Sequence, residues 1–382
     1  MKRTPVSPFM KAVFVLSLIV IGASLASPAQ ALRSPSVDAS ERLAVALNDD
    51  FDLATSIAAY PYSVTLDSFE ATEALDDPTS SKCNLNPGLA TVWYTYTPTA
   101  NVLIHMDTIG SNYDTYMALW TGSRGSLTEV ACNDDASPSD FASAIDITLV
   151  AGTTYYIEVA QFNGTISDSK VVTSKHIDEV AATTATHVFR LVQLYTRTYK
   201  SNAAHDGFVV ESSEASNIGL LKSPTVAYLK VGDDEKKRQN ISILSFDTSL
   251  LPDTAVVRLV MLKLKLDRIV GQPNIFTAFG GLRADIRQPF FGAGLVLEST
   301  DFQAAASQPL VGRFASVPVS GWYNARLGVT SFQYINLRGF TQFRLRFFKD
   351  DDNDLVADYV RFHSGNSILA NRPILIIRYY IP

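Results

Sequence analysis

The pattern of hydrophobic and polar positions is clearest in residues 238–266, where two apolar runs flank a turn at Leu251-Pro252-Asp253. In the second run, leucine and lysine alternate from Leu262 to Leu266, which is the period of a strand with one buried and one solvated face. Proline fixes φ and aspartate accepts hydrogen bonds from nearby N–H groups, so the break between the runs indicates a turn. Two β-strands joined by this turn are therefore predicted. The apolar residues of the two runs are Ile241, Ile243, Leu244, Phe246, Leu262, Leu264 and Leu266.

Residues 48–195 contain short runs of β-branched and aromatic residues, separated by glycine, proline, asparagine or aspartate. Such spacing is typical of an antiparallel β-sandwich. Trp93 and Tyr94 are adjacent in one run and point to opposite faces of the strand, so at least one of them is expected in the core. The runs cover residues 91–97, 101–106, 116–120, 145–150 and 155–160.

Alternation continues toward the C-terminus, where Phe343, Leu345 and Phe347 share one strand face and Arg344 and Arg346 share the other. A chain of 382 residues exceeds one ordinary core. The predicted fold is all-β, with two tandem antiparallel jelly-roll-like β-sandwiches. Their expected boundaries are residues 48–195 and 205–382, with residues 196–204 as a polar linker.

The first 31 residues carry the order of features that is typical of a secretory signal peptide. Basic residues come first, an apolar run follows from Ala12 to Ala26, and Ala29-Gln30-Ala31 supplies a cleavage site. Residues 32–47 would form a lead-in to the first sandwich. We expect a secreted or cell-surface protein without a membrane span after cleavage; an uncleaved N-terminal anchor is the alternative.

Charge and cysteine content narrow the class of protein further. The formal net charge is −6 and the chain has no lysine-arginine cluster, which disfavours nucleic acid as a partner. The only cysteines, Cys83 and Cys132, are expected to form a disulfide in an oxidising compartment. A two-cysteine metal site is the alternative, but it lacks histidines at a useful spacing.

Several phrases of residues 48–195 occur in the order of a known bacterial family. They include Pro61-Tyr62-Ser63, Gly110-Ser111-Asn112, Ala131-Cys132-Asn133-Asp134-Asp135 and Ala151-Gly152-Thr153. This region resembles the pre-peptidase C-terminal (PPC) family, apart from an insertion at residues 163–186. The resemblance implies a small accessory sandwich that binds or spaces and does not catalyse.

Residues 205–382 resemble a second family. The phrases Leu244-Ser245-Phe246-Asp247, Ser249-Leu250-Leu251-Pro252 and Arg372-Pro373-Ile374-Leu375 are similar to those of DNRLRE-type domains, which are carbohydrate-binding-module-like β-sandwiches of secreted bacterial proteins. This resemblance implies a jelly roll, and carbohydrate as the ligand class.

No common catalytic motif occurs in the sequence. A G-x-S-x-G elbow, an H-E-x-x-H helix, a Walker loop and a G-x-G-x-x-G turn are all missing, so the chain is not expected to be an enzyme. The five histidines are scattered, and structural or exposed roles are expected for them. Glycosidase carboxylates have no fixed spacing in sequence, so a polysaccharide-cleaving enzyme stays an alternative.

Acidic residues suggest structural calcium, because hard cations prefer several oxygen ligands from loops. In related jelly-roll modules a calcium ion lies between the first and last strands, which implies Asp206, Glu211 and Asp358 as ligands here. Asp134 and Asp135 beside the disulfide form a second candidate group, and the run from residue 350 to 354 is the densest acidic cluster. The alternatives are turn formation and a solvated hairpin tip.

Sugar recognition would use aromatic platforms, for which Trp322, Tyr323 and Tyr359 are the candidates. Arg344 and Arg346, on a wet face with Lys263 and Lys265, could bind an anionic polysaccharide. Buried aromatic residues and plainly solvated basic residues are the alternatives.

The predicted function is therefore that of a secreted, non-catalytic protein that binds carbohydrate or mediates surface adhesion, with a polysaccharide or cell-surface glycan as its partner. Besides the enzyme named above, the alternative is a structural or protein-binding spacer of the cell envelope.

Overall fold

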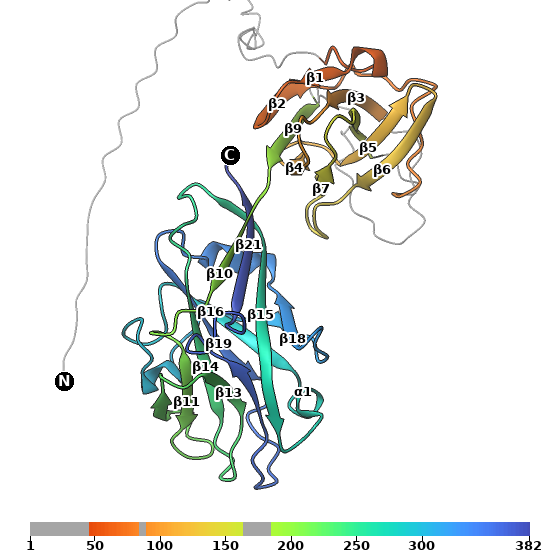
Figure 1. Ribbon diagram of the computed structural model, residues 1–382. Coiled ribbons are helices and arrows are strands. Elements are labelled where there is room, and N and C mark those ends of the chain that lie inside the picture. The colour runs from red at the N-terminus through yellow and green to blue at the C-terminus, as the bar shows by residue number, and fades with distance from the viewer. Residues whose placement is uncertain (1–45, 84–88, 163–184) are drawn as a thin grey trace, which may run out of the picture. The chain divides into compact units, whose positions relative to one another are not determined.

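The computed structural model describes residues 46–83, 89–162 and 185–382. Their regular secondary structure is almost entirely β-strand, and their helical elements are short: α1 (Ile275–Ala278) and three 3-10 turns (Figure 1). The all-β prediction is confirmed. The expected signal peptide, most of the lead-in and most of the insertion at 163–186 lie outside the described residues.

Two antiparallel layers form the N-terminal sandwich, residues 46–193. One sheet has the order β1-β3-β8-β5-β6 and the other β2-β9-β4-β7; every pair is antiparallel except β1 with β3. The strands are β1 (Thr55–Ile57), β2 (Tyr62–Asp67), β3 (Leu89–Tyr96), β4 (Val102–Asp107), β5 (Thr115–Ser123), β6 (Ser126–Asn133), β7 (Ala144–Leu149), β8 (Tyr155–Gln161) and β9 (Thr186–Gln193).

The five-stranded sheet of this sandwich is covered on both faces. Tyr94 packs between the two sheets, while Trp93 on the opposite face packs with Phe51 and the half-buried disulfide. Both side chains are buried, so the prediction that at least one lies in the core is confirmed. The Cys83–Cys132 disulfide is also confirmed, with 5.8 Å between the Cα atoms. It ties the loop before β3 to the edge strand β6.

A single 12-stranded sheet forms the C-terminal sandwich, residues 195–382, and folds into two layers. One layer has the order β10-β21-β15-β18, and the other contains β12-β11-β14-β19-β16-β17; β20 and β13 connect β15 to β14. The strands are β10 (Tyr195–Lys200), β11 (Gly207–Glu211), β12 (Gly219–Ser223), β13 (Tyr228–Gly232), β14 (Asn240–Asp247), β15 (Val256–Val270), β16 (Leu282–Arg287), β17 (Gln308–Arg313), β18 (Trp322–Arg326), β19 (Phe340–Phe347), β20 (Tyr359–His363) and β21 (Ile374–Tyr380).

The core of this sandwich lies between the two layers. Leu262 and Leu264 of β15 meet Phe343 and Leu345 of β19 in one cluster of buried side chains, as the alternation predicts. Strand β14 differs from the expectation of one wet face, because seven of its eight residues are buried. Its outward-facing Ile241 and Ile243 are covered by Phe291, Leu297 and Phe302 of the loop between β16 and β17.

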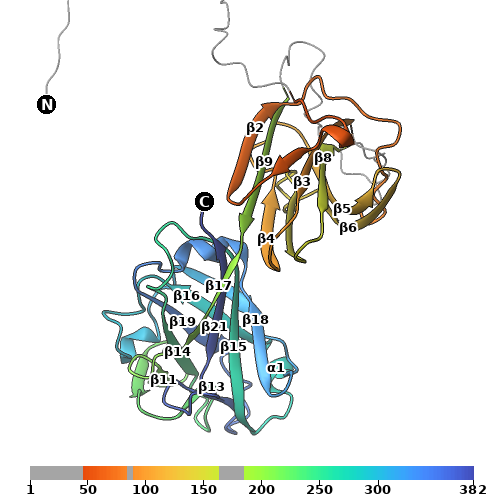
Figure 2. The same ribbon diagram turned by 45° about the horizontal axis from the view of Figure 1, so that its top comes forward.

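The predicted linker at residues 196–204 is wrong for its first half. Tyr195–Lys200 is strand β10, which pairs with β21 along its whole length and leaves one residue between β9 and β10 (Figure 2). The residues that follow are also bound to the sandwich, since Asn202 N donates to the carbonyl of Ser245. The first four side chains of this edge strand are exposed, so its sequence lacks the hydrophobic alternation that identifies a strand.

Candidate functional site

A tryptophan surrounded by lysines lies on the outer face of the β10-β21-β15-β18 layer. Directly opposed residues of antiparallel strands share a face, and Lys200 and Lys263 both oppose Ile374 while Lys265 opposes Trp322. The amino groups of Lys200, Lys263 and Lys265 lie 5.9, 5.6 and 5.6 Å from the centroid of the Trp322 ring. We call these four residues the tryptophan–lysine face. All four are half-buried, so their side chains lie along the sheet.

The four strands of this layer carry eight basic residues and one acidic residue. The acidic residue, Asp267, is paired with Arg361 at 2.9 Å. Among the described residues, no carboxylate lies within salt-bridge distance of the three lysines, and burial together with the charges of Lys263 and Arg372 lowers the pKa of Lys200. By strand register, five of these basic residues share the face of Trp322, so positive charge gathers there in a chain whose net charge is −6: Lys200, Lys263, Lys265, Arg326 and Arg378. The basic residues are Arg197, Lys200, Arg258, Lys263, Lys265, Arg268, Arg326 and Arg378.

The other two predicted aromatic platforms have different environments. Tyr323 follows Trp322 along β18 and therefore points the opposite way, into the core, where its ring stacks on Phe276 with 4.5 Å between the centroids. Tyr323 is thus not available as a sugar platform. Tyr359 is half-buried, and the amino group of Lys230 lies 4.1 Å from its ring centroid.

Arg344 and Arg346 lie on β19, in the opposite layer from Lys263 and Lys265. The expectation of one shared wet face is therefore wrong. Asp285 of β16 is fully buried and accepts hydrogen bonds from Arg344 Nη2 at 2.9 Å and from Arg346 Nε at 3.0 Å. Burial would raise the pKa of Asp285, but the hydrogen bonds from Arg346 and the Leu310 N–H and the charge of Arg344 hold it below its usual value.

Arg344 also organises the loop between β16 and β17. Its Nη1 donates to the carbonyl oxygens of Asp301, Phe302 and Ala304 at 3.3, 2.9 and 2.7 Å. With Arg346 it lines an open groove of about 480 Å³, whose wall includes the amide side chains of Asn217, Gln239 and Gln303. Arg344 thus stabilises the loop between β16 and β17, and it also lines a polar groove.

The calcium ligands implied by the DNRLRE resemblance do not form one site. Asp206 and Glu211 are both buried, but among the described residues neither joins Asp358 in a group of converging carboxylates. Each instead holds backbone N–H groups, which gives it a structural role in the turns around it. Asp206 accepts from Ser245 N at 2.8 Å and Gly365 N at 3.0 Å, and Glu211 accepts from Asn217 N at 2.6 Å and Gln239 N at 3.1 Å.

The second predicted calcium group, Asp134 and Asp135, lies in the loop between β6 and β7. Asp134 Oδ1 accepts a hydrogen bond from the Asp135 N–H at 3.0 Å, which supports the alternative of turn formation. Burial and the charges of Asp135 and Asp134 raise the pKa of Asp114 to about 6. Among the described residues, these carboxylates do not converge into a set of three ligands.

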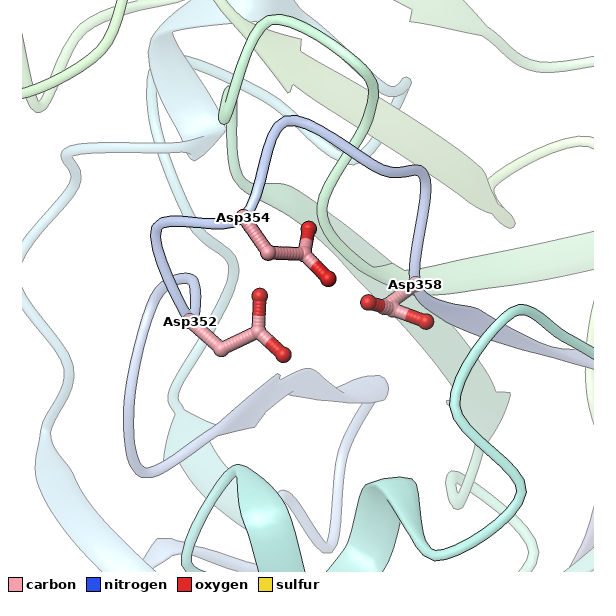
Figure 3. A group of neighbouring side chains, drawn as sticks. All are labelled: Asp352, Asp354 and Asp358. Atoms are coloured by element: carbon pink, nitrogen blue, oxygen red, sulfur yellow. The ribbon is translucent and has the colours of Figure 1, made fainter.

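Three other carboxylates do converge, in the loop that joins β19 to β20. One oxygen each of Asp352, Asp354 and Asp358 lies within 4.8 Å of the others, and Figure 3 shows the side chains gathered around one point. Asp358 is buried, Asp352 is half-buried and Asp354 is exposed. The sequence drew attention to this run through its density of charge, and to Asp358 through the family resemblance.

Asp233 directly follows β13 and contacts this loop through Asp358. It was not predicted from the sequence as a site residue. Its N–H donates to the Asp358 carbonyl at 2.8 Å, and its Oδ1 accepts from the Asp358 N–H at 2.9 Å. Its Oδ2 is buried without a hydrogen-bond partner. Burial, followed by the charges of Asp352, Asp358 and Asp351, raises its pKa to about 7. Strand pairing brings it there from 125 residues away, a contact that no local pattern could reveal.

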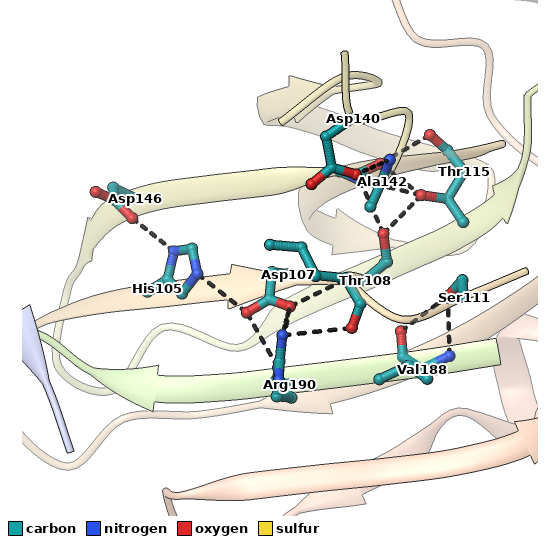
Figure 4. Close-up of polar contacts among 12 residues, drawn as sticks. His105, Asp107, Thr108, Ser111, Thr115, Asp140, Ala142, Asp146, Val188 and Arg190 are labelled. Carbon is teal, nitrogen blue, oxygen red and sulfur yellow. Dashed lines mark hydrogen bonds and ion pairs between the residues drawn. The ribbon is translucent and has the colours of Figure 1, made fainter. Parts of the chain in front are cut away.

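His105 is the centre of a polar group within the N-terminal sandwich (Figure 4). Its Nδ1 lies 2.7 Å from Asp146 and its Nε2 lies 3.0 Å from Asp107, which in turn is 2.6 Å from Arg190 Nη2. Burial lowers the pKa of His105, but the two carboxylates outweigh it and the pKa is raised. This buried, doubly paired ring agrees with the structural role expected for the histidines.

No protein-family model and no curated protein matches the chain. Two of the solved structures similar to it are a β-porphyranase of glycoside hydrolase family 86 from the human gut bacterium Bacteroides plebeius and a protein from Parabacteroides distasonis described as secreted. The first is 8% identical with a TM-score of 0.21, over 79% of this chain and 38% of the porphyranase. The second is 7% identical with a TM-score of 0.16, over 82% and 89% of the two chains.

The prediction that the chain is not an enzyme is contradicted by the first of these structures, which is a glycoside hydrolase. Missing motifs were a weak basis for that prediction, since glycosidase carboxylates have no sequence spacing that a motif search would find. A similarity at this TM-score assigns no reaction to the chain, and the resemblances to the PPC and DNRLRE families stay predictions.

Two observations concern the cellular location of the protein. The disulfide is typical of proteins that fold outside the reducing cytosol. Over the ranges that the structure covers, no helix has the length and apolar character needed to cross a membrane.

Proposed function

We propose that the C-terminal sandwich binds an acidic polysaccharide through the tryptophan–lysine face. The observation that carries this proposal is the Trp322 ring with three amino groups within 6 Å and no carboxylate to neutralise them among the described residues. Three like charges around one ring repel one another, and a bound anion would relieve that repulsion.

The chemistry of the face suits a sugar that carries carboxylate or sulfate groups. The flat face of an indole ring packs against the C–H groups of a pyranose, and ammonium groups form charge-assisted hydrogen bonds with anionic substituents. Lys200 and Lys263 come from strands separated by β21, so their backbones are about 10 Å apart.

The location of the face supports binding to a polymer. Regular strands form it, with the Lys265 amino group also held by the Ser320 carbonyl at 2.8 Å, so the positive groups are positioned before a ligand arrives. On an exported protein, as the disulfide and the expected signal peptide indicate, such a surface would attach the chain to an extracellular or cell-surface glycan.

The test is affinity electrophoresis of the purified protein in gels containing polygalacturonate, a sulfated galactan, or the neutral polymers agarose and dextran. The acidic polymers should retard the protein and the neutral ones should not. Trp322→Ala should weaken the retardation about tenfold or more, because it removes the ring and releases the three lysines.

Phe348→Ala is the matched control, since it truncates an exposed aromatic residue that lines the groove near Arg346. It should leave retardation unchanged. Equal retardation by neutral polymers would contradict the proposed preference for acidic sugars. A loss in Phe348→Ala but not in Trp322→Ala would move the binding site to the groove. No retardation of the folded protein by any polymer would favour a structural or protein-binding spacer.

The same mixtures should be assayed for new reducing ends and for unsaturated sugars. This measurement is independent of the binding surface, because it reports cleavage of the polymer wherever the reactive groups lie.

A further inference from the structure

The end of β13 and the loop between β19 and β20 bring acidic residues together in the C-terminal sandwich. Asp233 and Asp358 follow the last pair of the β13–β20 ladder and are joined by one backbone hydrogen bond and by a second from the Asp358 N–H to Asp233 Oδ1. Asp352 and Asp354 come from the adjoining loop, and their carboxylates converge with that of Asp358 (Figure 3). The three converging carboxylates and the neighbouring Asp233 come from two segments that are more than 100 residues apart in sequence.

A converging set of acidic side chains is common at protein surfaces, but Asp233 is different from a surface aspartate. It is 1% exposed, its Oδ2 has no hydrogen-bond partner, and its charged neighbours are Asp352, Asp358 and Asp351. A buried polar atom without a partner is costly, and one that faces like charges is more costly still. Such an atom indicates a ligand in the space that it faces.

The basic residues beside these carboxylates have other partners. Lys237 Nζ lies 2.6 Å from Glu214 and donates to Asn353 Oδ1 at 3.1 Å, while Arg238 Nη2 lies 2.7 Å from Asp234. Neither supplies a hydrogen bond to Asp233 Oδ2. Asp358 Oδ1 accepts a hydrogen bond from the Gln272 N–H and Asp354 Oδ1 one from the Val356 N–H, but among the described residues no basic side chain pairs with the four carboxylates.

We propose that Asp233, Asp352, Asp354 and Asp358 bind one calcium ion. All four side chains offer oxygen, none of the four ligands is nitrogen or sulfur, and three of them come from a loop or its border. This donor set suits a hard cation, and loop-borne carboxylates suit the irregular, many-oxygen coordination of Ca²⁺ better than the strict octahedron of Mg²⁺. The site differs from the calcium ligands expected from family resemblance in every residue except Asp358, and it does not depend on the proposed glycan binding.

The ion would have a definite structural effect. Bound to Asp233 and to the loop residues together, it would tie the β19–β20 loop to the end of β13 and satisfy the buried Oδ2. Calcium binds only the assembled set, so it should stabilise the folded protein by mass action.

Isothermal titration calorimetry and thermal unfolding of the purified protein test this proposal, in chelator and then in 1 mM CaCl2 at constant ionic strength. We expect one calcium per chain and a rise in Tm of about 5 °C. Asp354→Asn changes an exposed ligand without disturbing the core, and it should weaken calcium binding about tenfold. Asp350→Asn removes the same charge from the same loop outside the ligand set, and it should bind calcium like the wild type.

Asp233→Asn provides a second, opposite readout. In chelator this variant should be at least as stable as the wild type, because it removes an uncompensated buried charge, and its Tm should no longer respond to calcium. No calcium binding by the wild type, or equal weakening in Asp350→Asn and Asp354→Asn, would overturn the proposal.

Discussion

The two layers of the C-terminal sandwich contain the same short pattern with opposite results. Arg344-Leu345-Arg346 in β19 and Lys263-Leu264-Lys265 in β15 each place a buried leucine between two basic residues. The arginines share the buried carboxylate of Asp285, at 2.9 and 3.0 Å. The amino groups of Lys263 and Lys265 both lie beside the Trp322 ring, which is the partner that they have in common. Equal patterns therefore produce a structural ion cluster in one layer and an uncompensated positive surface in the other.

The residue on the neighbouring strand makes the difference. Asp285 of β16 opposes Arg344, whereas Trp322 of β18 opposes Lys265. Arginine is suited to the first position, because its planar group can donate to a carboxylate and to three carbonyl oxygens at once. Lysine is suited to the second, since its compact ammonium group can lie beside an aromatic ring without a carboxylate partner. A charge is available for binding only where the fold has not already neutralised it.

The largest expected effect comes from removing the shared carboxylate. Asp285→Asn leaves Arg344 and Arg346 without their counter-ion and should lower the free energy of unfolding by about 3–5 kcal/mol. Asp267→Asn is the matched control in the other layer; its half-buried pair with Arg361 should contribute about 1 kcal/mol or less. Urea unfolding of both variants measures the difference, and similar small losses in the two would show that the arginine cluster is not structural.

An intermediate effect is expected at the tryptophan–lysine face, on binding and not on stability. Lys263→Gln with Lys265→Gln should weaken retardation by acidic polysaccharides about tenfold, because two charge-assisted contacts are lost. The free energy of unfolding should change by less than about 0.5 kcal/mol, as is usual for surface positions. A double variant that unfolds more easily but binds normally would show that these lysines stabilise the fold and do not bind the polymer.

The smallest effect expected is on the pH dependence of stability. The pKa of Asp285 in the folded protein lies below its ordinary value of 3.8, so its ion cluster contributes stability above about pH 4 that is lost as pH falls through the folded pKa. Between pH 5 and pH 3 the wild type should lose about 1 kcal/mol more than Asp285→Asn in urea unfolding. Retardation by a sulfated polymer should not change over this range, because Asp285 lies in the other layer from the tryptophan–lysine face. Parallel pH profiles for the two proteins would contradict the assignment.

The fold was largely predictable because alternation is a local signal. The leucines and lysines of β15 and the aromatic residues of β3 and β19 identify strands from their own sequence. Strand β10 was missed because its exposed threonine and arginine side chains carry no such signal; its partner β21 lies more than 170 residues away. The covered outer face of β14 was missed for the same reason, since the covering loop is distant in sequence.

The candidate sites were predictable only in part. Trp322, Lys263 and Lys265 were identified from residue type and spacing and Asp358 from the family resemblance, but their neighbours Lys200 and Asp233 were not identified. Strand pairing brings these two residues to the sites from distant segments, and a search for motifs along the chain cannot find them.

The amino-acid sequence by itself determined the all-β class, the Cys83–Cys132 pairing and the two-sided character of most strands, because each depends on residue type and on periods of two. Only the tertiary structure decided which charges have partners. Register places Asp285 between two arginines, leaves three lysines around Trp322, and brings Asp233 to the acidic loop. Electrostatic function depends on such distances of a few ångströms between remote residues, and these distances exist only after the strands have paired.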